Sequence, residues 1–275
     1  MYNWKKIIAL FGILSLMVGS ISAQDVAVHI QSEKHKGEET KEVESSTLYI
    51  SGKNVKGVTE DNSGYFIFRG DEKTIWFVED EKETATEISE EAIKKISAQL
   101  DKIRKTLDDM PEEQREMVKR MMQQKMKNFE LPPEGEKEDL KLKRTEQTKT
   151  INDYSCKKVE VWKGSAKIAD MWIAEWDSVQ YTEELKSAYV EMAEFAHSLR
   201  SILSNSLRQN YIQMPITQSG LGEEAGGMPI CTVHYTEDNE IASKTTVKKI
   251  EAVDLSEESF RPPENYKLTK PQISK

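Results

Sequence analysis

The sequence predicts an α+β protein built on a curved antiparallel sheet. Strand-like segments recur about every ten residues near the N-terminus, which is typical of a curved antiparallel sheet or barrel. Two later stretches repeat apolar residues at the three- and four-residue spacing of amphipathic helices. Because strand-like segments return after each helical stretch, the order favours one α+β domain with helical insertions over two separate domains.

The N-terminal strands are predicted from residue 26 onward. They are residues 26–30, 46–50, 53–59, 65–68 and 74–78. The last two are continuous apolar runs around Gly70 and Asp71, a strong hairpin signal. Continuous runs predict strands that are covered on both faces.

Helical insertions are predicted near residues 89–129 and 180–210. Ser89, followed by two glutamates, is an N-terminal helix signal, and apolar residues then recur up to residue 107. Pro111 starts a second helix, to about residue 129. Strands fill 140–176, 228–236 and 241–253. The domain is expected to span residues 24–267, with a C-terminal tail at 268–275.

The first 23 residues have the pattern of a secretory signal peptide. Two lysines precede an apolar run, and small residues lead to a cleavage site near Ala23. An uncleaved membrane anchor is the alternative, although the run is shorter than the ~20 residues of a span. We therefore expect a periplasmic or secreted protein with no transmembrane span in the mature chain.

The composition excludes some classes of function. The chain holds 39 basic and 48 acidic side chains, a net charge of −9. Cleavage after Ala23 removes Lys5 and Lys6, which leaves 37 basic groups and a net charge of −11. Nucleic-acid binding is not expected, because phosphate neutralisation needs a basic surface.

Cys156 and Cys231 are the two cysteines of the chain. In an oxidising compartment an even count usually indicates a bridge, so a Cys156–Cys231 disulfide is predicted. Two buried free thiols are the alternative.

No catalytic or metal-binding motif stands out. The Ser155-x-x-Lys158 spacing falls on a predicted strand, where positions three apart point to opposite faces. Glu194 and His197 are half of a carboxylate-bridged metal site that lacks its other half. We expect neither an enzyme nor a bound metal or cofactor.

Five methionines lie on and before the second predicted helix: Met110, Met117, Met121, Met122 and Met126. Thioethers fill irregular apolar space and also form adaptable binding surfaces. In an exported protein they can also bind cuprous copper. All three interpretations stay open at this point.

Three segments resemble an uncharacterised family of exported bacterial proteins, a domain of unknown function similar to the periplasmic lipoprotein-carrier superfamily. They are residues 110–122, residues 151–159 leading to 171–175, and residues 260–267. Asn152 and Asp153 stand where the family usually has glycine before its Tyr-x-Cys element, and both are turn residues. The resemblance implies a curved antiparallel half-barrel with helices packed on its concave face. Characterised members of the superfamily bind acyl chains or sense envelope stress.

Two functional hypotheses follow. The first is a binding protein that holds an apolar ligand, such as a lipid or lipoprotein acyl chain, between the sheet and its helices. Its candidate lining is Phe66, Phe68, Trp76, Met117, Met121 and Trp172. The second is an envelope structural or protein-interaction module, with an envelope protein partner, whose helices complete the core.

Overall fold

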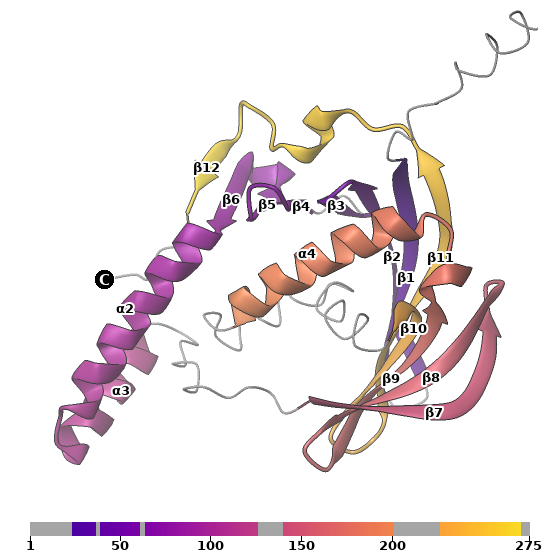
Figure 1. Cartoon of the computed structure of the whole chain (residues 1–275). Coiled ribbons are helices and arrows are strands. Elements are labelled where there is room, and N and C mark those ends of the chain that lie inside the picture. Colours follow the sequence, from indigo (N-terminus) through magenta and orange to yellow (C-terminus); the bar gives the residue numbers. More distant parts are fainter. Residues whose placement is uncertain (1–23, 37–38, 61–63, 126–139, 201–225, 271–275) are drawn as a thin grey trace, which may run out of the picture.

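A single large sheet curves around one helix in the computed structural model of the chain (Figure 1). The structure describes residues 24–36, 39–60, 64–125, 140–200 and 226–270. Within these residues, twelve strands follow the order β12-β6-β5-β4-β3-β2-β1-β11-β10-β9-β8-β7. Neighbouring strands are antiparallel except for β12 with β6.

The elements have the following bounds. The strands are β1 Asp25–Lys36, β2 Glu39–Ser51, β3 Asn54–Thr59, β4 Tyr65–Arg69, β5 Thr74–Glu79, β6 Thr84–Ser89, β7 Leu140–Ile151, β8 Tyr154–Lys163, β9 Ala166–Glu175, β10 Gly227–Tyr235, β11 Ile241–Val253 and β12 Lys267–Thr269. The helices are α2 Glu90–Asp108, α3 Glu112–Lys125 and α4 Thr182–Arg200, with short turns η2 Asp80–Lys82, η3 Trp176–Ser178 and η5 Glu257–Phe260.

The predicted α+β class with a large curved antiparallel sheet is confirmed, and the sheet is open rather than closed into a barrel. Two strands extend further than predicted, because β1 and β2 continue as a charged hairpin as far as Lys36 and Glu39. The short strand β6 was not predicted. Strand β12 runs to Thr269, two residues beyond the expected end of the domain. The predicted signal peptide lies outside the described residues.

Local sequence signals set the ends of these elements. The Ser89 hydroxyl accepts a hydrogen bond from the Ala92 amide at 3.3 Å, which caps α2 as predicted. Asn152 and Asp153 have φ values of 47° and 70° between paired Ile151 and Tyr154. Two positive φ values are the geometry of a type I′ hairpin turn, which asparagine and aspartate tolerate well.

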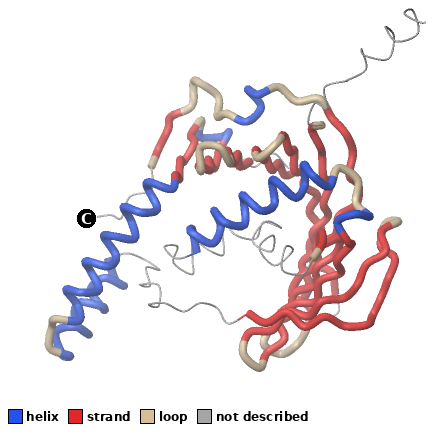
Figure 2. Tube along the Cα trace, in the orientation of Figure 1, coloured by secondary structure: helices blue, strands red, loops and turns tan. Residues whose placement is uncertain are grey.

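The inner face of the sheet and the buried side of α4 form the main core. Strand alternation directs Val28 and Leu48 to this face, where both are buried. Helix α4 adds a buried stripe at the three- and four-residue spacing: Leu185, Ala188, Met192 and Phe195. Figure 2 shows α4 lying within the curve of the sheet, while α2 and α3 lie beside it.

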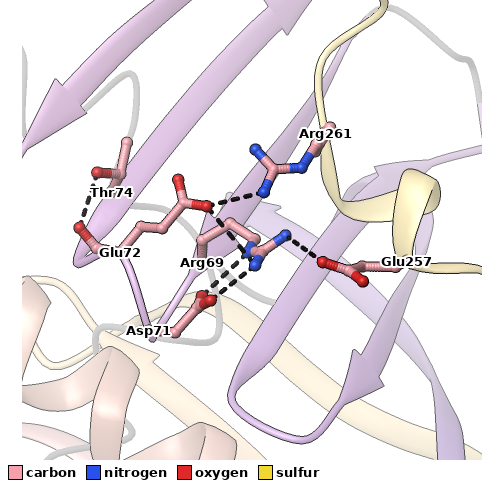
Figure 3. A network of polar contacts seen from close by, with 6 residues as sticks. All are labelled: Arg69, Asp71, Glu72, Thr74, Glu257 and Arg261. Atoms are coloured by element: carbon pink, nitrogen blue, oxygen red, sulfur yellow. Dashed lines mark hydrogen bonds and ion pairs between the residues drawn. The ribbon is translucent and has the colours of Figure 1, made fainter.

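A C-terminal segment covers the outer face of β4, β5 and β6. Phe260, on η5, is 1% exposed and packs with Ile67 and Trp76. Beside it, the buried Arg69 guanidinium donates two hydrogen bonds to the Asp71 carboxylate, at 2.6 and 3.0 Å, and forms an ion pair with Glu257 on η5 (Figure 3). Arg261 reaches Glu72 in the same network. The motif at residues 260–267 therefore has a structural role.

The predicted Cys156–Cys231 disulfide is not formed, and both cysteines are free and buried. Cys156 pairs with Ala174 and Cys231 with Trp172, on opposite sides of β9. Strand β9 therefore separates the strands of the two cysteines by two spacings of about 4.8 Å. The resulting Cα–Cα distance exceeds the ~7 Å that a disulfide can span. Burial raises the pKa of the Cys156 thiol to about 11 and also raises that of Cys231. The structure therefore shows the alternative, two buried thiols.

Candidate functional site

Three of the six predicted lining residues belong to the core around α4. Phe66 and Phe68 are 5% and 0% exposed, and Trp172 packs against the same cluster. The Phe66 ring covers Gly57, where a Cβ atom would lie 2.0 Å from the ring. These side chains are in contact with protein atoms, and none of them lines the groove described below.

The other three candidates lie elsewhere. Trp76 pairs with Ile67 and packs with Phe260 on the outer face. Strand alternation directs Trp76 to this face of the sheet, whereas Phe68 points to the inner face. Met117 and Met121 lie on α3 and are 63% and 50% exposed. The structure therefore does not bring the six predicted residues together in one site.

Helix α4 occupies the inner face where an apolar ligand was expected. The Phe195 and Phe68 rings lie 5.2 Å apart between centroids. Glu191 accepts hydrogen bonds from Lys53 and Lys73, which come from the β2–β3 and β4–β5 turns. These hydrogen bonds lower the pKa of the Glu191 carboxyl. Glu194, the glutamate of the Glu-x-x-His motif, also pairs with Lys73, so both glutamates attach α4 to the sheet.

The α2–α3 hairpin extends from the sheet as a separate structural feature (Figure 1). Helix α2 packs against β6 and α4 near its start, and α3 folds back on it. Arg115 donates hydrogen bonds to the carbonyl oxygens of Leu107, Asp108 and Met110, at 2.9, 3.1 and 3.3 Å. Leu107 and Asp108 lie in the last turn of α2, where carbonyls lose their regular helical partners, and Met110 follows it, so Arg115 caps α2 and fixes the turn.

A shallow apolar groove of about 250 Å³ lies between the two helices of this hairpin. It is lined by Lys102, Ile103, Thr106, Leu107, Met110 and Val118. Met117 and Met121 are one helical turn apart on α3, next to Val118. Together they extend the apolar surface of the groove onto an exposed helix face. We call this region, the groove with Met117 and Met121, the hairpin surface.

The sequence had indicated the hairpin surface only in part. The apolar repeat of α2 contains Ile103 and Leu107, and the methionine cluster contains Met110. The sequence did not show that the last turn of α2 leaves the core and pairs with α3 instead. Val118 was missed, although it lies four residues before Met122.

A second polar cluster, centred on Asp170, has a structural explanation. The Asp170 carboxylate, 5% exposed as a residue, lies 2.9 Å from the Lys158 ammonium and accepts a hydrogen bond from the Tyr235 hydroxyl at 2.8 Å. Burial alone would raise the pKa of Asp170, but these partners outweigh it and lower the pKa. The cluster joins β8, β9 and β10.

Two negative findings apply to the described part of the chain. No three His, Cys, Asp or Glu side chains gather there in a way that could hold a metal ion. None of its helices combines the length and the apolar content that crossing a membrane requires.

Comparison with known proteins gives structural likeness alone. The sequence matches no family model and no curated protein. An uncharacterised conserved protein of Thermus thermophilus has a TM-score of 0.43 at 8% identity, over 90% of this chain and 91% of that one. The Pseudomonas aeruginosa MucA/MucB complex gives 0.37 at 6% identity, over 90% of this chain and 59% of that one.

A further likeness is to a domain assigned as an outer membrane lipoprotein-sorting protein of Vibrio parahaemolyticus. Its TM-score is 0.29 at 9% identity, over 86% of this chain and 89% of that one. At these scores the comparisons indicate no ligand or activity, and the functional argument rests on this chain's own residues.

Proposed function

We propose that this chain is an exported, non-enzymatic binding protein that receives an apolar ligand, such as a lipid or lipoprotein acyl chain, at the hairpin surface. One observation carries this proposal. The inner face of the sheet is packed by α4, whereas Met117 and Met121 are exposed beside an apolar groove. Single exposed apolar side chains are common on protein surfaces and need no explanation. A group of them next to an apolar groove favours a binding site.

The construction of the hairpin supports this proposal. Arg115 fixes the turn between the helices through three hydrogen bonds, so contacts within the protein hold the two helices that form the groove. Pre-formed sites lose less conformational entropy when they bind. Methionine thioethers adapt to ligands of different shape, which suits acyl chains.

Binding of a fluorescent, uncharged monoacylglycerol to the purified protein tests the proposal. The Val118→Asp variant places a carboxylate in the groove, and desolvating it should weaken binding about ten-fold or more. Val43→Asp is the matched control, because Val43 is an exposed valine on β2. It should leave binding unchanged. Absence of saturable binding by the parent protein, or equal loss in both variants, would contradict the proposal.

Native mass spectrometry of protein purified from its own cells provides an independent measurement. A retained lipid should appear as added mass and be lost from Val118→Asp. An added mass that this variant retains would place the ligand elsewhere, for example between α4 and the sheet.

The envelope-interaction hypothesis shares the plugged core but not the lipid. It would be favoured if the parent protein bound no monoacylglycerol and if Val118→Asp nevertheless failed to replace the parent protein in cells that lack it. A protein partner at the hairpin surface would then replace the proposed ligand.

A further inference from the structure

Helices α2 and α3 form a two-helix hairpin that reaches away from the sheet and leaves apolar surface exposed (Figure 1). Met117 and Met121 are four residues apart and form a ridge along α3. The groove beside this ridge is lined by apolar side chains of both helices, among them Leu107 and Val118. In four-helix bundles, a helix pair buries such a surface against a second pair.

The hairpin surface combines the two shapes that a contact between identical copies needs. A two-fold contact brings the same patch of both copies together, so the patch must be complementary to itself. Here a ridge and a groove lie side by side, and the ridges of one helix pack into the grooves of another. A rotation by half a turn can therefore place the Met117–Met121 ridge of each copy in the groove of the other.

The charges of the hairpin match an antiparallel arrangement of the two copies. Residues 105–116, around the turn, hold five acidic and two basic side chains, and the basic Arg115 donates to carbonyl oxygens of the turn. Residues 97–104 and 117–125, further from the turn, hold one acidic and five basic side chains. In an antiparallel pair, the acidic turn of each hairpin lies beside the basic segment of the other. A parallel pair would bring like charges together.

The helix dipole does not account for the acidic turn. Negative charge is favourable at the start of a helix, which explains the acidic first turn of α3. Asp108 and Asp109, however, lie at the C-terminal end of α2, where the dipole disfavours them. Their position is explained if a basic segment of a second copy lies beside the turn.

We infer that two copies of this chain associate through their hairpin surfaces as an antiparallel, two-fold four-helix bundle. The inference concerns the same surface as the proposed function but goes beyond it, because it does not depend on a ligand. A bound apolar ligand and the second copy would exclude each other.

Sedimentation equilibrium of the purified protein over a wide range of concentrations tests the inference. The parent protein should show a monomer–dimer equilibrium. Met121→Asp should weaken the dimer at least ~ten-fold, because each dimer would desolvate two carboxylates. Val43→Asp, at an exposed valine of β2, is the control and should leave the dimer unchanged. Met117→Asp serves as a second variant if Met121→Asp does not fold.

Charge reversal tests the antiparallel arrangement. Glu112→Lys combined with Glu113→Lys should weaken the dimer about ten-fold, because the turn would then face a basic segment of the partner. Lys119→Glu combined with Arg120→Glu should have the same effect. All four substitutions in one chain should restore association to within about three-fold of the parent. A folding defect would not produce this recovery.

The outcomes separate this inference from the proposed function. A monomer at every concentration, or a dimer that Met121→Asp leaves unchanged, would overturn the inference and leave the proposed function intact. Failure of the combined charge reversal to restore the dimer would also overturn it. A dimer with the expected variant effects, from a parent protein that binds no monoacylglycerol, would support the inference and contradict the proposed function alone.

Discussion

Phe195→Ala tests whether α4 is a permanent part of the core. Phe195 is 4% exposed and packs against Phe68, so truncation removes a contact between helix and sheet. An aromatic side chain buries at least ~150 Å², which at ~25 cal/mol per Å² corresponds to about 4 kcal/mol. Observed Phe→Ala losses of ~3–5 kcal/mol agree with this value.

The assay is equilibrium unfolding in urea, followed by tryptophan fluorescence and by circular dichroism. Coincident transitions are needed before a free energy of unfolding is extracted. Trp176 is a suitable reporter, because its ring lies 6.2 Å from that of Tyr189 on α4. The variant should have a lower midpoint with an unchanged m-value.

Lys186→Ala is the control, since Lys186 is exposed on the same helix. It should change the free energy of unfolding by less than ~0.5 kcal/mol. A loss below ~1 kcal/mol for Phe195→Ala would refute the reasoning. It would show that α4 is loosely held, and would return the inner face to consideration as a ligand cavity.

Four further predictions concern the remaining features. Thiol labelling of the unfolded, unreduced protein should find two free cysteines, Cys156 and Cys231, whereas the same thiols should react slowly in the folded protein. The absence of free thiols in the unfolded protein would show a disulfide and contradict the structure. N-terminal mapping of secreted material should begin at Gln24, and an intact Met1 would rule out cleavage. Burial lowers the pKa of His234, so the folded protein binds this proton less readily than the unfolded chain, whose histidine titrates near ~6.5. The free energy of unfolding should therefore fall as the pH drops below ~6.5, by at most ~1.4 kcal/mol per pH unit, and His234→Gln should remove this contribution. Asp170→Asn leaves the charge of Lys158 without its counter-ion and should lower the free energy of unfolding by about 2 kcal/mol. This is less than the ~3–5 kcal/mol of a fully buried pair, because Lys158 keeps some contact with water. An unchanged midpoint of thermal or urea unfolding would show that the pair is not needed.

The sequence predicted most elements because local signals decided them. Ser89 caps α2, and Asn152 with Asp153 forms a hairpin turn whose positive φ values few other residues tolerate. Apolar repeats located α2 and α4. Strand β6 was missed because its six residues, Thr84–Ser89, contain only two aliphatic side chains besides threonine.

The faces of the strands could not be predicted in the same way. Phe66, Phe68 and Trp76 all lie in continuous apolar runs, so periodicity could not assign them to a face. The assignment depends on a distant residue, since Phe260 covers Trp76 from near the C-terminus. The cysteine pairing failed for a similar reason, because the strand order places β9 between the two residues.

The position of β1 in the sheet has a consequence for how the chain folds. Strand β1 comes first along the described residues, yet it lies between β2 and β11, and Asp25 pairs with Val253. Strand β12, which comes last among the described residues, pairs with β6, another strand far from it in sequence. Ribosomal synthesis must therefore supply nearly the whole chain before the centre of the sheet can close. Contacts of such long sequence separation slow folding, so we expect refolding over milliseconds to seconds or longer, with exposed strand edges in the meantime.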